Sequence, residues 1–174
     1  LTAPLAAAIR DILTAPRDGD ALLGDVSDMR RRMVRELGGG DIWDIKHLRG
    51  GLIDIEFIAQ YLQLRHAHDT PEVLAPNTTD ALARLGDAGL IDRATVGELI
   101  AAMGLWRNLQ GILRLGFGDG FSEDSAPEDS RNLVARACGA ESFDALKQKI
   151  AATAGRVHAI FETLIEAPAP QARD

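Results

Sequence analysis

Apolar residues recur at spacings of three and four along nearly the whole chain, which is the period of a helix that buries one face. No stretch alternates apolar and polar residues convincingly, so the sequence predicts no sheet. The pattern predicts an all-α bundle of about seven helices. In chain order, their apolar positions are Leu5, Ile9, Ile12 and Leu13; Leu22, Val26, Met29, Met33 and Leu37; Leu52 to His66; Leu82 and Leu85; Val96, Leu99, Ile100, Met103, Trp106, Leu109 and Leu113; Leu133, Val134 and Ala137; and Phe143, Leu146, Ile150, Ala154, Val157, Phe161 and Leu164.

Residues that favour helix ends separate these segments. N-terminal caps are predicted at Asn77 or Thr78, Asp92 and Ser142. Helix ends are predicted near Pro16, at Gly38–Gly40, near Gly89 and around Gly139. Residues 1–167 are therefore expected to form a single helical domain, and residues 168–174 a frayed tail. Because the sequence begins with Leu1 and enters a helix almost at once, we expect it to be part of a longer polypeptide.

Composition narrows the class of protein. Hydrophobic residues make up 46% and charged residues 26% of the 174 residues, which excludes disorder and fibrous folds. The apolar runs are too short to span a membrane. A net charge of −7 argues against a broad nucleic-acid surface. The single cysteine, Cys138, permits no internal disulfide, so we expect a reducing, cytoplasmic location and a buried, unreactive thiol.

Positive charge gathers in one part of this acidic chain. Residues 30–49 hold six Lys or Arg side chains against three acidic ones, an excess of +3. Such a patch suits one anionic ligand, although a solvated helix face explains an arginine run equally well.

Two other features give weak signals for chemistry. The run GFGDG at 116–120 follows a helix instead of a strand, so it predicts a connector, not a nucleotide loop. His66 and His68 are two residues apart and would point in different directions on a helix. Neither they nor His47 and His158 have ligands at zinc spacing, so no metal site is predicted.

The segment 41–67 is the most informative part of the chain. A Gly50-Gly51 pair precedes a helix that is apolar on nearly every side, as expected for a central helix. Glycine permits a positive φ or a close backbone approach there. The free N–H groups of the first helical turn, with Lys46 and Arg49 beside them, could cradle a phosphate.

Polar residues on so apolar a helix need partners. Asp54 lies in the first turn, where it can accept hydrogen bonds from N-terminal amides. Glu56, Gln60 and Gln63 share one face. The purely structural interpretation is that Asp54 caps the helix while Glu56 and Gln60 cross-link helices through hydrogen bonds.

The run IKHLRGGLIDIEFIAQYL resembles the K-x-x-x-G-G-[IL]-x-[DE]-I-E-F-x-x-Q signature of the bifunctional glutamine synthetase adenylyltransferase family. The flanking runs RDILTAPRD, MRRRM, NTTDALARLGDAGLI, LWRNLQGILRL and VHAIFETLI resemble the same family. Members adenylylate glutamine synthetase and remove the AMP by phosphorolysis. Each of their two halves has a nucleotidyltransferase core followed by a helical domain. Asp54 and the run QLRHAHDTPE resemble the domain after the C-terminal, adenylylating core.

The resemblance implies that the catalytic residues lie outside this sequence. The family core uses a Gly-Ser turn and an Asp-x-Asp strand pair to hold Mg²⁺, and this chain has no Gly-Ser pair. On a helix, Asp54 and Glu56 would point about 200° apart and could not share one ion. We therefore expect no catalytic residue or metal in this chain, no stable cofactor and no activity on its own. The parent enzyme would use ATP and Mg²⁺.

The resemblance also implies partners and an orientation. Lys46, Arg49, Gly50 and Gly51 would face the catalytic cleft of the upstream nucleotidyltransferase core. The other helices would contact glutamine synthetase or the PII signal protein, and neither nucleic acid nor a membrane is expected. Two alternatives are a non-catalytic helical interaction module and the helical domain of a PII uridylyltransferase. The continuation DIEF-x-x-Q favours the adenylyltransferase over the uridylyltransferase.

Overall fold

Seven α-helices follow one another in the computed structural model, which describes residues 3–37, 41–118 and 120–169, and no strand occurs in these ranges. The prediction of an all-α bundle is confirmed. The helices are α1 (Ala3–Leu13), α2 (Gly19–Leu37), α3 (Leu52–His66), α4 (Thr78–Asp87), α5 (Arg93–Phe117), α6 (Glu128–Ala137) and α7 (Phe143–Phe161), with a 3₁₀ turn η1 (Pro71–Val73) and a π-helical turn η2 (Glu162–Glu166). No helix of the described ranges is long and apolar enough to cross a membrane.

Side-chain caps begin three of these helices, as the sequence predicts. Asn77, Asp92 and Ser142 accept hydrogen bonds from the backbone N–H groups three residues further on, at 2.8, 2.9 and 3.1 Å. Gly89 and Gly139 follow α4 and α6 with φ angles of 71° and 67°. The predicted stop at Gly38–Gly40 and most of the predicted tail, 170–174, lie outside the described residues.

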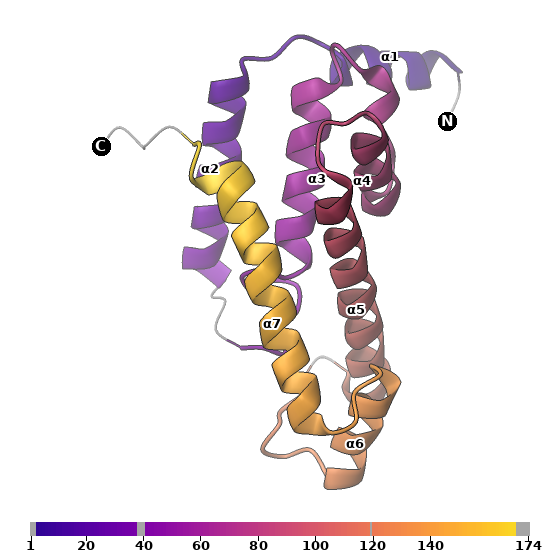
Figure 1. Cartoon of the computed structure of the whole chain (residues 1–174), viewed down its shortest axis with the longest axis vertical. Helices are drawn as coiled ribbons and strands as arrows, with labels where there is room; N and C mark the ends of the chain where they lie inside the picture. The colour runs from indigo at the N-terminus through magenta and orange to yellow at the C-terminus, as the bar shows by residue number, and fades with distance from the viewer. Residues whose placement is uncertain (1–2, 38–40, 119, 170–174) are drawn as a thin grey trace.

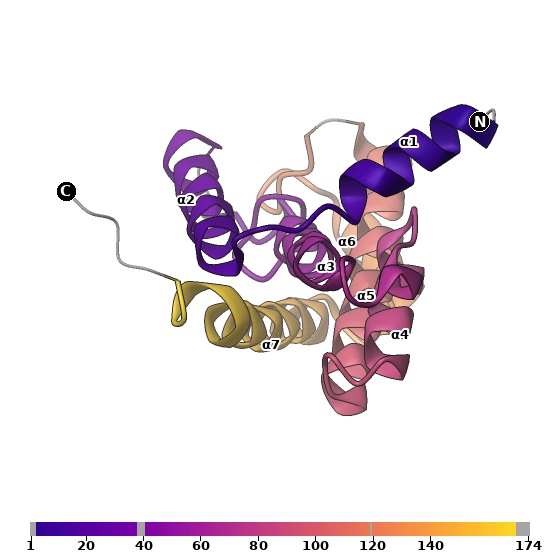
Figure 2. The ribbon, with the colours of Figure 1, turned by 90° about the horizontal axis from the view of Figure 1, so that it is seen from above.

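Helix α3 lies at the centre of the bundle. It packs against α2, α4, α5 and α7, and Figure 2 shows it between them. Eight of its fifteen residues are buried, which confirms the central helix that the sequence predicts. At the lower end of Figure 1, α6 packs against α5 and α7.

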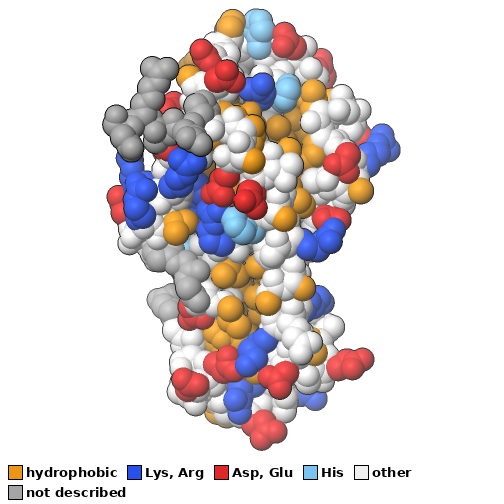
Figure 3. All heavy atoms as spheres, turned by 60° about the vertical axis from the view of Figure 1, so that its left-hand side comes forward, with side chains coloured by type: hydrophobic (Ala, Val, Ile, Leu, Met, Phe, Trp, Pro, Cys, Tyr) orange, Lys and Arg blue, Asp and Glu red, His pale blue; other side chains and the backbone are white. Residues whose placement is uncertain are grey.

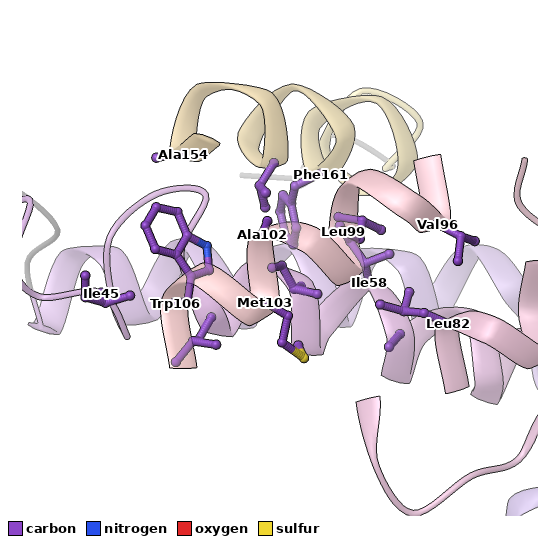
Figure 4. Close-up of a cluster of buried hydrophobic side chains, with 14 of the residues drawn as sticks. Ile45, Ile58, Leu82, Val96, Leu99, Ala102, Met103, Trp106, Ala154 and Phe161 are labelled. Atoms are coloured by element: carbon purple, nitrogen blue, oxygen red, sulfur yellow. The ribbon is translucent and has the colours of Figure 1, made fainter. Parts of the chain in front are cut away.

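Aliphatic side chains from α3, α4, α5 and α7 fill most of the core, together with two large aromatic residues. Trp106 of α5 and Phe161 of α7 are both fully buried. Figure 4 shows Trp106 between α7 and the segment that carries Ile45, so the core joins the turn before α3 to the long helices.

Helix α2 has the predicted length but buries a different face. The prediction placed Met29 and Leu37 on the apolar face, yet they are 58% and 54% exposed. The buried residues are Leu23, Ser27 and Arg30. The apolar pattern was misleading because a charged side chain, paired inside the molecule, occupies the buried face.

Two other predicted faces need correction. No residue of α1 is buried, although the helix forms as predicted. At the C-terminal end of α7 the helix widens into η2, so the chain advances more slowly around the axis. Ile165 is therefore fully buried, while Leu164, the predicted core position, is only partly buried.

Candidate functional site

A buried ion pair connects α2 with the start of α3. Arg30 and Asp54 are both fully buried, and the Nε of Arg30 donates to Oδ1 of Asp54. The Nη2 of Arg30 also donates to the backbone carbonyls of His47 and Leu48, at 3.1 and 3.4 Å. One guanidinium therefore fixes α2, α3 and the turn between them in a single arrangement.

Gly50 lies at the centre of this arrangement and tolerates no side chain. Its N–H donates to Oδ2 of Asp54 at 2.5 Å, and its carbonyl accepts from Nε1 of Trp106 at 3.2 Å. Its φ is 80°, and a Cβ there would lie 1.9 Å from the backbone oxygen of Ala154. Both the conformation and the close approach of α7 require glycine. We call Arg30, Asp54, Gly50 and Trp106 the buried node.

The three backbone N–H groups that follow Gly50 are also hydrogen-bonded. The N–H groups of Gly51, Leu52 and Ile53 donate to the carbonyls of Leu48, Ile45 and Lys46, at 2.8, 3.0 and 3.3 Å. A Cβ on Gly51 would lie 2.3 Å from the Ile45 oxygen. The preceding turn and Asp54 already use the N–H groups of residues 50–53, so these groups are not the free amides that the predicted phosphate cradle requires.

Arg49 binds the C-terminal end of the helical chain. Its Nη2 donates to Oε1 of Glu166 at 2.7 Å and lies 3.3 Å from Nδ1 of His158. Its guanidinium carbon also lies 5.7 Å from the centre of the Phe161 ring. The charge of Arg49 is thus compensated within the domain, and its position ties the turn to α7 and η2.

Lys46 differs from Arg49, Gly50 and Gly51 because its side chain is exposed. Its backbone carbonyl is held by Ile53, but its side chain is exposed. It lines an open pocket of about 390 Å³ together with Arg114 of α5 and the aromatic Trp43, whose ring stacks on Phe143 at 5.1 Å. Among the described residues, neither Lys46 nor Arg114 has a carboxylate within ion-pair distance.

The remaining arginines of the basic segment are on the surface. Arg31 pairs with Asp28 at 3.2 Å, and Arg32 and Arg35 are exposed. Figure 3 turns the side of the molecule that carries α2 toward the viewer. On this face, Lys and Arg side chains gather beside acidic and histidine side chains. The basic segment therefore contains two arginines bound within the domain, Arg30 and Arg49, and three on the surface.

The predicted polar face of α3 is only partly used. Gln63 accepts a hydrogen bond from the N–H of Ala75 at 2.8 Å. Glu56 is half-buried and Gln60 is exposed, and neither side chain hydrogen-bonds to another described residue. The predicted cross-links by Glu56 and Gln60 are thus absent from the described part of the chain.

Of the other candidates, Cys138 lies apart from this site, while His47 and His158 contact its arginines. Cys138 is buried as predicted, and burial raises the pKa of its thiol, which keeps the sulfur protonated and unreactive. His47 pairs with Asp44 at 3.0 Å, and His158 with Arg49. Within residues 3–37, 41–118 and 120–169, no group of three His, Cys, Asp or Glu side chains is placed to hold a metal ion.

A family model described as GlnD PII-uridylyltransferase matches residues 28–165 of the chain. The match covers the buried node, α2 from residue 28 onward, and helices α3 to α7. The chain belongs to the GlnD PII-uridylyltransferase family. The four residues of the buried node lie inside the matched range, and α1 lies outside it.

Curated relatives carry a second name. The chain is 43% identical over 157 residues to a protein of Rhodopseudomonas palustris (strain TIE-1), and 40% identical over 166 residues to one of Bradyrhizobium diazoefficiens. Both are named bifunctional glutamine synthetase adenylyltransferase/adenylyl-removing enzyme, which confirms the resemblance found in the signature. The matches cover 90% and 95% of this chain but only 16% and 17% of those proteins. The chain thus spans about one sixth of their length.

The sequence singles out Asp54 and Gly50 of the buried node but not their partners Arg30 and Trp106. Arg30 was counted as part of a surface run, and Trp106 only as a core residue. A usable signal existed, since Leu23, Ser27 and Arg30 recur at helical spacing on one face of α2. Two of these three residues are polar, so the hydrophobic pattern does not mark this face as buried. The signal for a buried Arg30 is that a buried Asp54 requires a charged or hydrogen-bonding partner.

Proposed function

We propose that this chain is the helical domain of a nucleotidyltransferase that adenylylates glutamine synthetase and removes the AMP again. The observation that carries the proposal is the identity of about 40% over at least 90% of the chain to enzymes of that name. The chain spans only a sixth of those enzymes, so the catalytic core would belong to another part of the parent polypeptide.

The residues of this domain do not fit a magnesium site of their own. Both carboxylate oxygens of Asp54 already accept hydrogen bonds, from Arg30 and from Gly50. Glu56 follows two residues later on the same helix, so its carboxylate points away from that of Asp54. We therefore assign ATP and Mg²⁺ to the core of the parent enzyme, and no chemical step to a metal held here.

The contribution of this domain would be a rigidly placed positive charge. Transfer of AMP from ATP to a tyrosine hydroxyl of glutamine synthetase places negative charge on the phosphates, and a preorganised cation stabilises that charge. Lys46 fits this role because its backbone is fixed to the first turn of α3 while its side chain stays exposed. Arg49, Gly50 and Gly51 would hold the turn in place without touching the nucleotide.

A second candidate is the helical domain of a PII uridylyltransferase, favoured by the description of the matching family model. The same turn would then face a core that transfers UMP. In either enzyme the outer helices would contact the protein substrate, and the PII signal protein would be a further partner of the adenylyltransferase. An assay of the parent enzyme with ATP or UTP, and with glutamine synthetase or PII as acceptor, separates the two candidates.

Substitution of Lys46 in the full-length parent enzyme tests the proposed role. We expect Lys46→Ala to lower the rate of AMP transfer by about 10²–10³ at an unchanged melting temperature, because the cation that stabilises the transferring group is lost. Lys46→Arg retains part of the rate if charge alone matters. Arg136→Ala removes another exposed cation, on α6, whose side chain makes no hydrogen bond or ion pair among the described residues, and serves as the control.

Two results would overturn the proposal. Wild-type kinetics of the Lys46→Ala enzyme at subsaturating ATP would show that Lys46 is a solvated loop residue with no role in AMP transfer. AMP transfer to glutamine synthetase by the 174-residue chain alone would contradict the assignment of catalysis to another part of the polypeptide.

A further inference from the structure

Helix α1 is amphipathic but buries nothing in its own domain. Its apolar positions Leu5, Ile9 and Ile12 are 49%, 39% and 65% exposed, and no residue of the helix is buried. Figure 2 shows α1 extending away from the bundle. An isolated helix of eleven residues is marginal in water, since most helical stability in proteins comes from packing an apolar face. We therefore expect the apolar face of α1 to pack against another segment that stabilises the helix.

A groove runs beside this helix. It has a volume of about 920 Å³ and lies between α1, the C-terminal half of α3 and the segment 71–76. Apolar side chains form most of its wall, including Ile9, Leu13, Leu64 and Leu74. The connection that follows α1 is fixed beside it, because Nδ1 of His68 donates to the carbonyl of Thr14 at 3.1 Å. The groove and the exposed face of α1 thus form one apolar surface, which we call the α1 surface.

The α1 surface lies at the opposite end of α3 from the buried node (Figure 1). Only the wall contributed by α1 lies outside the matched family range, which begins at residue 28, whereas the walls from α3 and the segment 71–76 lie inside it. The Bradyrhizobium relative matches 95% of the chain, and this match covers only 17% of that relative. A parent polypeptide of that length has about five sixths of its residues outside this chain, which is enough to supply a cover for α1.

We propose that the α1 surface is an intramolecular docking site for a segment of the parent polypeptide that lies outside these 174 residues. The proposal rests on the proposed function only in assuming the longer parent chain. The segment is an amphipathic helix whose apolar side chains pack against Leu5, Ile9 and Ile12. Its rim carries an acidic residue, because Arg10 is exposed at the edge of the groove and pairs with no carboxylate among the described residues. The exposed amide of Gln60 offers it a further hydrogen bond.

Hydrogen exchange in the purified full-length parent enzyme tests the proposal. We expect the amides of residues 3–13 to exchange roughly 10-fold or more slowly than those of an uncovered helix of that length. Leu5→Asp would remove this protection and would also expose a second peptide outside the 174 residues, which identifies the docked segment. An acidic residue is favourable in the first turn of a helix, so the loss would not come from a weaker helix.

Leu115→Asp is the matched control, because Leu115 is 91% exposed on α5 and contributes to no groove described above. It leaves both peptides unchanged. Fast exchange of α1 in the wild-type parent, or loss of protection in α1 without a second peptide, contradicts the proposal. Protection of α1 that grows with enzyme concentration would assign the surface to a second copy of the chain and also contradicts it. These readouts do not depend on AMP transfer, so they remain informative if the proposed function fails.

Discussion

The two ends of α3 differ in how their polar and apolar groups are used. At the N-terminal end, Asp54, Gly50 and the following amides are all bonded inside the molecule. At the C-terminal end, α1 leaves its apolar face open and Gln60 is exposed. The signature therefore marks the place where the fold is fixed, while two exposed surfaces lie elsewhere, at Lys46 and at α1.

Truncation of isoleucine at the two sites gives the largest expected contrast. Ile55 is fully buried in α3, whereas Ile12 of α1 is 65% exposed. We expect Ile55→Ala to lower the free energy of unfolding by about 2–5 kcal/mol. Phe161→Ala, at a fully buried position of α7, has a similar effect. Ile12→Ala changes the stability of the 174-residue chain by about 0.5 kcal/mol or less. Urea unfolding measures all three, and equal losses would show that the buried faces are misassigned.

Substitution of glycine by alanine is expected to lower the free energy of unfolding at Gly50 and to raise it at Gly104. Gly50→Ala destabilises the domain by more than about 1 kcal/mol, because its positive φ and the Ala154 oxygen exclude a Cβ. Gly104 lies exposed inside α5, and a Cβ there meets nothing within 4 Å. Gly104→Ala therefore stabilises by about 0.5–1 kcal/mol. Thermal melting of both variants checks this, and a stable Gly50→Ala would remove the steric argument for the signature glycine.

The C-terminal end of α3 gives the smallest predicted effect. Partial burial, and then the nearby Arg65 charge, lower the pKa of His66 below its usual 6.5. Between the lowered folded pKa and 6.5, the unfolded chain binds the proton more strongly, so stability falls as the pH falls through this window. Urea midpoints measured from pH 7.5 to 5 are expected to fall less in His66→Gln than in the wild type. An identical slope in both proteins would show that His66 contributes nothing.

Helix positions could be predicted because local chemistry sets them. Asn77, Asp92 and Ser142 cap their helices through neighbours three residues away, and such contacts are visible in sequence. The face of α2 could not be predicted in the same way. It depends on Arg30 meeting Asp54, 24 residues away, and the hydrophobic pattern treats a buried arginine as a surface residue. The hydrogen bonds of the amides before and in the first turn of α3 could not be predicted for a related reason. The carbonyls of Ile45, Lys46 and Leu48 accept hydrogen bonds from the N–H groups of residues 51–53, and the sequence pattern does not show this turn.

The central claim is that the signature carboxylate serves the fold, and a double-mutant cycle between Arg30 and Asp54 tests it most directly. Urea unfolding would be measured for Asp54→Ala, Arg30→Met and the double variant. The exposed Arg31–Asp28 pair on the same helix gives a matched control with a coupling of about 0–1 kcal/mol.

We predict that Asp54→Ala costs about 3–5 kcal/mol, because it leaves a buried guanidinium without its charge partner. The double variant loses clearly less than the sum of the single losses, by about 2–3 kcal/mol. Single losses below about 1 kcal/mol that simply add would contradict the claim, since they would show that Arg30 and Asp54 do not hold this domain together.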